Sequence, residues 1–271
     1  MRALRVIVSL VFVVVLVAYV FFHYTKSTDT TMPKIRCDTS VIEVSVEDGD
    51  DELLKHITAT DEKDGDISKN VIVEKSSAFV DFGKVIITFA VCDNDNNVAK
   101  INVPVVYKDY ENPKFEFVDD LVFKRNIKPN ISDCIKVTDS FDGDITDRLV
   151  VISNGADPEV NGKYPITLKI TNSKSYTYTM NVDLIMSDYF TTGYSIELKE
   201  YFIYKKVGRE IDYNSVIKSV ANPPLNTQSY QIDIDSSEVD SSKAGVYNAF
   251  YYLKSGGQTK AMTRLIVCYE D

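Results

Sequence analysis

The sequence predicts an all-β protein, built as three tandem β-sandwiches that follow an N-terminal apolar helix. Three observations support this fold class. Apolar side chains alternate along several short segments, one strand pattern occurs three times, and no long stretch after residue 26 has a helical period. The composition agrees, because 17 Tyr and 13 Phe in a Val- and Ile-rich chain favour strands over helices. A length of 271 residues allows two domains or three small ones.

Three glycine-led segments carry the repeat. They are GKVIITFAV at Gly83, GKYPITLKI at Gly162 and GVYNAFYYL at Gly245, which lie 79 and then 83 positions apart. The second, fourth, sixth and eighth residues after each glycine are mostly large and apolar, as in a strand with one buried face. These residues are Val85, Ile87, Phe89 and Val91; Tyr164, Ile166, Leu168 and Ile170; and Tyr247, Ala249, Tyr251 and Leu253. The spacing suits one small sandwich per copy and predicts sandwiches over residues 33–109, 110–187 and 188–271, in an extended array.

An acidic turn precedes the glycine strand in the first two copies, as TDEKDGDIS from Thr60 and TDSFDGDIT from Thr138. The preferred interpretation is structural. Asp side chains accept bonds from backbone N–H groups nearby, and Gly adopts positive φ, so the turn bonds to itself and places Ile67 or Ile145 in the core. The third copy lacks this turn, and Pro223 and Pro224 are expected to supply the bend.

Calcium binding is the alternative interpretation of the acidic turn, because calcium prefers several carboxylate oxygens in one loop. The candidate ligands in the first copy are Asp61, Asp64 and Asp66, with Asp109 and Glu111 at the following junction. Asp139, Asp142 and Asp144 are the equivalents of the three turn residues in the second copy.

The acidic turn, the glycine strand and the polar segment CDNDNN together resemble the bacterial immunoglobulin-like repeat family of the Cry22Aa type. Residues 33–109 match best, residues 110–187 keep TDSFDGDIT and GKYPITLKI, and residues 188–271 share only the glycine strand. The resemblance implies immunoglobulin-like (Ig-like) sandwiches outside the cell that act as spacers or adhesion modules. It implies no catalytic activity.

The N-terminal 26 residues differ from the rest, because Val6 to Phe22 are apolar except for Ser9. A helix over this run measures about 26 Å, near the lower limit for crossing a bilayer. A cleaved signal peptide is the alternative interpretation, but bulky residues follow Ala18 where a cleavage site requires small ones, so an uncleaved segment is preferred. The sequence therefore predicts a single-pass membrane anchor over residues 1–26. Arg2 and Arg5 before the run predict a cytoplasmic N-terminus and sandwiches outside the cell.

The charge and the reactive residues indicate a binding protein rather than an enzyme. The net charge is −10, and residues 1–26 contribute +3, so the remainder carries −13, which argues against a nucleic-acid partner. His23 and His56 belong to no catalytic or zinc pattern, and no phosphate-binding glycine loop occurs. We therefore expect no enzymatic activity and no cofactor.

The cysteines Cys37, Cys92, Cys134 and Cys268 do not have the spacing of a zinc site. A disulfide between Cys37 and Cys92 is an alternative, although Cys92 lies on the strand face opposite the core positions. The predicted function is adhesion, spacing or docking to cell-envelope proteins or polysaccharide, with calcium or carbohydrate binding as the alternative.

Overall fold

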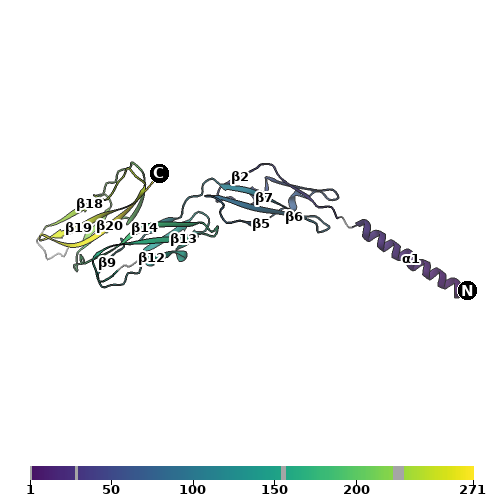
Figure 1. The fold of residues 1–271 in the computed structure, drawn as a ribbon, viewed down its shortest axis with the longest axis horizontal. Coiled ribbons are helices and arrows are strands. Elements are labelled where there is room, and N and C mark those ends of the chain that lie inside the picture. The colour runs from purple at the N-terminus through teal and green to yellow at the C-terminus, as the bar shows by residue number, and fades with distance from the viewer. Residues whose placement is uncertain (1, 28–29, 154–156, 222–228) are drawn as a thin grey trace. The chain divides into compact units, whose positions relative to one another are not determined.

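The computed structural model describes residues 2–27, 30–153, 157–221 and 229–271 of the chain. It divides into two compact units, residues 1–110 and 111–271. Apart from one long N-terminal helix, the described regular structure is mostly β-strand (Figure 1). The predicted all-β class is therefore confirmed for the region after that helix. Pro223 and Pro224, expected to bend the third copy, lie outside the described residues.

Helix α1 covers Arg2–Ser27, and its described side chains, from Val6 to Phe22, are all exposed. The predicted membrane anchor is corrected by this structure. Within the described side chains, no helical segment is both long and apolar enough to cross a membrane. The apolar run itself is short, since the 17 residues from Val6 to Phe22 give about 26 Å of helix against about 30 Å of bilayer hydrocarbon. The predicted placement of the N-terminus in the cytoplasm and of the sandwiches outside the cell depended on that anchor and is withdrawn with it.

The first unit contains two sheets that enclose one core. One sheet has the strand order β1-β3-β4 and the other β2-β7-β6-β5. The elements are β1 (Lys34–Cys37), β2 (Ile42–Val44), α2 (Asp50–Leu54), β3 (Ile57–Asp61), β4 (Gly65–Asp66), the 3-10 turn η1 (Ser68–Asn70), β5 (Ile72–Ser76), β6 (Lys84–Cys92) and β7 (Val98–Tyr107).

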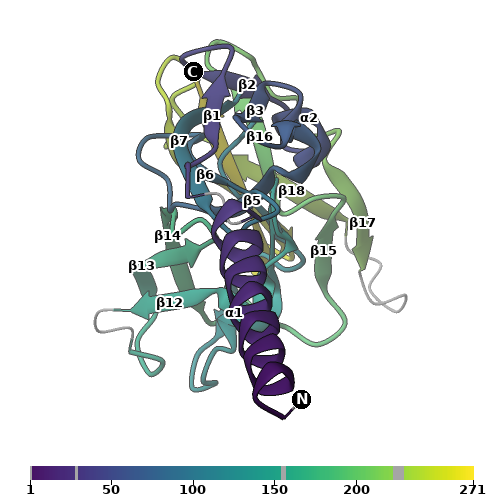
Figure 2. The same cartoon turned by 90° about the vertical axis from the view of Figure 1, so that its right-hand side faces the viewer.

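The second unit contains four sheets. The first pair has the orders β11-β10-β8 and β12-β13-β14-β9, and the second pair has β15-β17 and β16-β20-β19-β18. Figure 2 shows β12, β13 and β14 as neighbours in one of these sheets. The elements up to residue 187 are β8 (Lys114–Phe117), β9 (Val122–Lys124), η2 (Ile131–Cys134), β10 (Ile135–Asp139), β11 (Gly143–Asp144), η3 (Thr146–Arg148), β12 (Val150–Ser153), β13 (Gly162–Thr171) and β14 (Thr177–Ser187). The later strands are β15 (Ser195–Leu198), β16 (Phe202–Lys206), β17 (Ile217–Ala221), β18 (Tyr230–Asp235), β19 (Gly245–Ser255) and β20 (Gln258–Glu270).

The same topology occurs three times along the chain. In each four-stranded sheet the first strand lies at an edge and pairs in parallel with the last strand: β2 with β7, β9 with β14, and β16 with β20. The remaining neighbours in these sheets pair antiparallel. The third copy has no described equivalent of β4 and β11, the short strands formed by the acidic turn. The repeat deduced from three glycines is thus a repeat of strand order.

The alternating positions of the glycine strands form the cores, as predicted. Val85, Ile87, Phe89 and Val91 are at most 2% exposed, and Ile166, Leu168, Ile170, Ala249, Tyr251 and Leu253 are equally well buried. Tyr164 and Tyr247, at the start of their strands, are only partly buried. Burial of one side chain of this size typically contributes about 1.5–3 kcal/mol, so each glycine strand stabilises the sheet to which it belongs.

The two sheet pairs of the second unit lie side by side rather than end to end (Figure 1). Phe202, Ile266 and Cys268 of the third copy are buried in the same cluster as Phe117 and Ile135 of the second. Phe117 and Phe202 stack with their ring centroids 4.7 Å apart. Within residues 111–271 the expected extended arrangement is therefore wrong, because the outer face of the β16-β20-β19-β18 sheet is itself apolar.

Candidate functional site

The acidic turn of the first copy bonds to its own backbone. Asp61 Oδ1 accepts hydrogen bonds from the N–H groups of Lys63 (2.8 Å) and Asp64 (3.0 Å). Asp66 Oδ1 accepts from the N–H (3.0 Å) and the hydroxyl (2.6 Å) of Ser68. Gly65 between them has a φ of +75°. These hydroxyl and backbone bonds hold the pKa of Asp66 below its ordinary value.

The second copy repeats this arrangement. Asp139 Oδ1 accepts from the N–H groups of Phe141 (2.9 Å) and Asp142 (3.3 Å), and Asp144 Oδ1 accepts from the N–H of Thr146 (2.9 Å). Ile67 and Ile145, which follow the two turns, are 6% and 0% exposed. The structural role predicted for this turn accounts for these contacts.

The other two candidate calcium ligands lie at the junction and have protein partners. Asp109 accepts hydrogen bonds from the Ser45 hydroxyl (2.5 Å) and the Val46 N–H (2.9 Å), and these bonds lower its pKa. Glu111 lies 3.6 Å from the Lys114 ammonium, both in the second unit. Among the residues that the structure describes, no group of three or more His, Cys, Asp or Glu side chains could hold a metal ion.

The two acidic turns differ in one buried contact. Asp139 Oδ2 accepts a hydrogen bond from the Asn172 side-chain amide at 3.2 Å. The first copy has Asp93 at the position of Asn172, directly after the glycine strand, and Asp61 Oδ2 is buried without a hydrogen-bond partner. Asp61 and Asp93 are 8% and 6% exposed. One carboxylate oxygen of the first copy therefore lacks the donor that its equivalent has.

The reactive side chains show no catalytic arrangement in the described part of the chain. His56 Nδ1 lies 2.9 Å from Asp38 Oδ1, and His23 lies outside the described side chains. All four cysteines are free thiols, so the alternative Cys37–Cys92 disulfide is absent. Burial raises the pKa of both Cys134 and Cys268 to about 11, which keeps these two thiols protonated near neutral pH.

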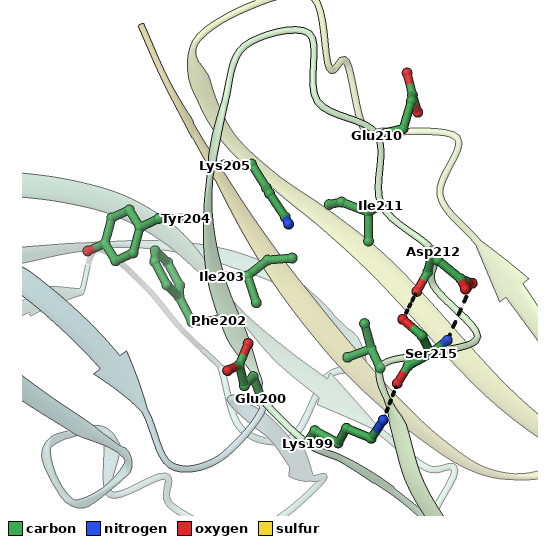
Figure 3. A pocket seen from close by; sticks show the side chains of 11 residues that line it. Lys199, Glu200, Phe202, Ile203, Tyr204, Lys205, Glu210, Ile211, Asp212 and Ser215 are labelled. Carbon is green, nitrogen blue, oxygen red and sulfur yellow. Dashed lines mark hydrogen bonds between the residues drawn. The ribbon is translucent and has the colours of Figure 1, made fainter.

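One groove lies beside β16 in the third copy, and we call it the β16 groove (Figure 3). Its volume is about 730 Å³. Ile203, Ile211 and Val216 are its partly buried apolar residues. Phe202 and Tyr204 also line it, together with charged and hydroxyl residues: Lys199, Glu200, Lys205, Glu210, Asp212 and Ser215.

Hydrogen bonds fix the wall of the β16 groove opposite β16. The Lys199 ammonium donates to the Ser215 carbonyl at 2.6 Å, and the Ser215 hydroxyl donates to the Asp212 carbonyl at 2.7 Å. Figure 3 shows the side chains of Ile203 and Lys205 directed toward this wall, and those of Phe202 and Tyr204 directed to the other side. The four consecutive residues 202–205 nevertheless all line the groove. Consecutive residues of a strand point to opposite faces, so all four can line one groove only where the groove runs along the edge of the strand.

The first two copies fill the corresponding connection with a helical turn. Leu53 of α2 is 4% exposed, and Cys134 of η2 is 7% exposed. In the third copy the connection, residues 207–216, has no helix. The groove is therefore a feature of the third copy that the shared topology does not require.

A second groove, the aromatic groove, lies between the second and third copies and has a volume of about 510 Å³. Its rings come from Tyr189, Phe250 and Tyr252, and Tyr189 is 45% exposed. The Tyr189 and Tyr252 rings meet edge to face with centroids 6.3 Å apart. The polar lining includes Asn161, Lys163, Asp188, Asp235 and Glu238.

Polar contacts order the side chains of the aromatic groove. The Asn161 amide donates to Asp188 Oδ2 at 2.7 Å, and Arg125 pairs with Asp188 at 3.0 Å. Lys163 forms an ion pair with Glu238, and its ammonium lies 4.9 Å from the centre of the Phe250 ring. Phe250 and Tyr252 belong to the glycine strand GVYNAFYYL, on the face opposite its core positions, so alternation places their rings together. No sequence pattern identifies Tyr189.

A buried polar cluster holds the two copies of the second unit together. Arg264 is fully buried, and its guanidinium donates to the carbonyls of Asp120 (2.9 and 3.1 Å) and Asp183 (2.7 Å). The Thr263 hydroxyl donates to Asp120 Oδ2 at 2.7 Å, and the Asn248 amide donates to Asp183 Oδ2 at 2.9 Å. Each of these donors belongs to the third copy and each acceptor to the second, so the cluster fixes how the two pack.

Comparisons with known proteins do not identify a family. No protein-family model matches the chain, and no curated protein matches it. Among solved structures, the CBM51-2 and INT domains of Clostridium perfringens ZmpB in complex with GlcNAc are 17% identical over 87% of this chain, with a TM-score of 0.23. The protocadherin γB4 extracellular domain is 10% identical over 90% of the chain (TM-score 0.21), and the human desmocollin-1 ectodomain is 14% identical over 88% (TM-score 0.19).

The chain spans 41% of the ZmpB structure, 51% of the protocadherin and 62% of the desmocollin. Similarities with such low identities and TM-scores carry no argument about function.

Proposed function

We propose that this chain is a non-catalytic binding protein made of three tandem Ig-like sandwiches, related to the bacterial Ig-like repeat family of the Cry22Aa type. Its role is adhesion, spacing or the docking of a partner. The observation that supports docking most directly is the β16 groove, which combines apolar residues, charged residues and a strand edge. A sandwich can bind through an edge or a groove without any reactive group.

The proposed modules are residues 33–109, 110–187 and 188–271. The threefold repetition of strand order supports this division. Residues 33–109 also have a core cluster of their own, whereas the cluster of residues 110–187 includes Phe202, Ile266 and Cys268 of the third copy. The second and third modules act as one body, because their shared interface buries aromatic rings and a charged side chain. A rigid pair of modules presents its grooves in a fixed geometry, which lowers the entropic cost of binding.

Carbohydrate binding in the aromatic groove is the second candidate. Sugars stack their apolar faces on aromatic rings and accept or donate hydrogen bonds at carboxylates and amides. Tyr189 and Tyr252 supply rings, and Asn161, Asp188 and Glu238 supply polar groups beside them. Calcium is not favoured, because the acidic turns use their carboxylates in backbone hydrogen bonds.

Binding of the full chain to two ligand panels tests the proposed function. One panel holds soluble cell-wall polysaccharides and the other a phage-displayed library of random peptides, with product analysis after long incubation. We expect saturable binding to at least one panel and no chemical change in any ligand. Absence of binding to both panels contradicts adhesion and docking, and conversion of a ligand contradicts the non-catalytic assignment.

Variants distinguish the two grooves in the same assay. Replacing Tyr189 and Tyr252 with Ala is expected to abolish polysaccharide binding and leave peptide binding intact. Tyr230→Ala is the matched control, because Tyr230 is 48% exposed and does not line the aromatic groove. If the control and the Tyr189 and Tyr252 variants lose equal affinity for polysaccharide, the polysaccharide binds at another surface.

A further inference from the structure

We propose that the β16 groove binds an extended polypeptide segment of a partner protein, which adds as a new strand to the free edge of β16. The inference rests on the proposed binding function and names the chemistry of its ligand. It is supported by the backbone of β16, by the composition of the groove and by the comparison with the first two copies.

The backbone of β16 has one paired side and one open side. The Ile266 N–H donates to the Tyr201 carbonyl, and the Val207 N–H donates to the Glu270 carbonyl, both at 2.9 Å. In a parallel pair, alternate residues of a strand bond to the same neighbour. Residues 201, 203, 205 and 207 therefore direct their backbone groups toward β20. The alternate residues Phe202, Tyr204 and Lys206 direct theirs away from it.

Among the described strands, none pairs with the open side of β16, since β16 is the edge of the sheet ordered β16-β20-β19-β18. The Lys206 carbonyl accepts a bond from the Arg209 N–H at 3.1 Å. The N–H groups of residues 202, 204 and 206 and the carbonyls of residues 202 and 204 remain along the edge. Donors and acceptors that repeat at every second residue match the backbone of another extended strand.

The groove beside this edge has the composition that a strand ligand needs. Successive side chains of a strand point to opposite faces. An added strand would place one set against the apolar residues Ile203, Ile211 and Val216 and the other toward solvent. Lys205 points into the groove (Figure 3), so an acidic residue is expected in the ligand near this position.

The first two copies show why the third is the docking module. Their β2 and β9 strands are also sheet edges, but Leu53 and Cys134 are buried in the connections that follow. The third copy lacks such a helical turn, and the groove is present beside its edge strand. Natural sheets usually protect an edge with charge or cover, and Lys205 and Lys206 limit indiscriminate pairing here.

Two substitutions at one residue test the backbone contact. Lys206→Pro and Lys206→Ala both remove the exposed side chain, but only Pro removes the N–H, and this N–H is not part of the β20 ladder. For a peptide selected from the phage library on the full chain, we expect Lys206→Pro to weaken binding about tenfold, which is the typical effect of one hydrogen bond. Lys206→Ala should change the affinity by less than about twofold, since an exposed side chain contributes little.

A second measurement does not depend on how the variants fold. N-methylation of single amides along the selected peptide removes one donor at a time. We expect affinity losses that alternate with a period of two residues, as strand pairing requires. Three results would each overturn the inference. The first is a series of affinity losses without alternation, and the second is equal affinity of the Lys206→Pro and Lys206→Ala variants. The third is unchanged affinity of the Ile211→Asp variant for the selected peptide.

The outcomes also separate this inference from the proposed function. If the full chain binds polysaccharide and selects no peptide, strand addition is wrong and the binding function stands. If it binds neither panel, both are contradicted.

Discussion

At the scale of single residues, the first and second copies differ at a buried carboxylate. Asp139 has the Asn172 amide as a partner, whereas Asp61 Oδ2 has none and Asp93 stands at the equivalent position. A buried acceptor without a donor typically costs about 1–3 kcal/mol. The turn is therefore formed in both copies but is less well satisfied in the first.

Asp93→Asn is expected to stabilise the first unit by about 1 kcal/mol, because the new amide can donate to Asp61 Oδ2. The bonds that Asp93 Oδ1 accepts from the Asp95 and Asn97 N–H groups are retained by Asn, although the bond from the Asn97 amide to Oδ2 is lost. Urea unfolding of the full chain measures the change. The reciprocal variant Asn172→Asp should destabilise the second unit, and a loss of stability in Asp93→Asn contradicts this account.

Asp120 makes the stability of the second unit depend on pH. The pKa of Asp120 is raised to about 7, chiefly by burial. The Thr263 and Val122 hydrogen bonds and the charge of Arg264 lower it, whereas the charge of Asp119 adds to the rise. In the unfolded chain the pKa is about 4. The folded state thus holds a proton that the unfolded state releases between these values. The stabilisation is complete below about pH 4 and is lost as the pH rises through about 7.

We expect the free energy of unfolding of the second unit to fall as the pH rises from about 4 to about 7. Carboxyls with lowered pKa values, such as Asp142 and Asp144, have the opposite effect on the free energy of unfolding, which they lower as the pH falls. Their effect lies at pH values below this range. Asp120→Asn isolates the effect because Asn does not titrate. Its pH profile should be flatter than that of the wild type, and parallel profiles would contradict the assignment.

At the scale of elements, the acidic turn depends on one backbone conformation. Gly65 has a φ of +75°, and a Cβ atom there would meet nothing within 4 Å, so only the backbone conformation opposes a side chain. Gly65→Ala is expected to cost about 1–2 kcal/mol. Gly49→Ala in the same unit is the control, because Gly49 has a φ of −83° and its Cβ position is also open. Equal stability of the two variants in thermal unfolding would contradict the turn model.

The sequence predicts the elements well where one physical signal dominates. Alternation identifies the buried faces of β6, β13 and β19, and the D-G-D-I pattern identifies two turns that place Ile67 and Ile145 in the core. The β16 groove could not be predicted in this way. It depends on the connection from Val207 to Val216, whose path is set by contacts such as the Lys199–Ser215 bond rather than by a local pattern.

At the scale of the whole molecule, the sequence indicates the repeat but not the side-by-side packing within residues 111–271. One feature of the sequence does indicate this packing. Residues 261–269 of β20 form an almost continuous apolar run, which is typical of a strand covered on both faces, and all nine are buried. Arg264 within that run obscured the signal, since a charge in a strand ordinarily indicates a solvent-facing position. Here its charge is buried and bonded to carbonyls of the neighbouring copy.

The central structural claim is that the second and third copies form one cooperative body, joined through Arg264 and the apolar cluster around Phe202. The most direct test is native-state hydrogen exchange on the full chain, wild type and Arg264→Met. The substitution leaves the Asp120 and Asp183 carbonyls without their buried donor and should cost about 3–5 kcal/mol. We predict that β13 and β14 lose protection together with β19 and β20, by the same free energy. Loss confined to β19 and β20, with β13 and β14 unchanged, would contradict the account.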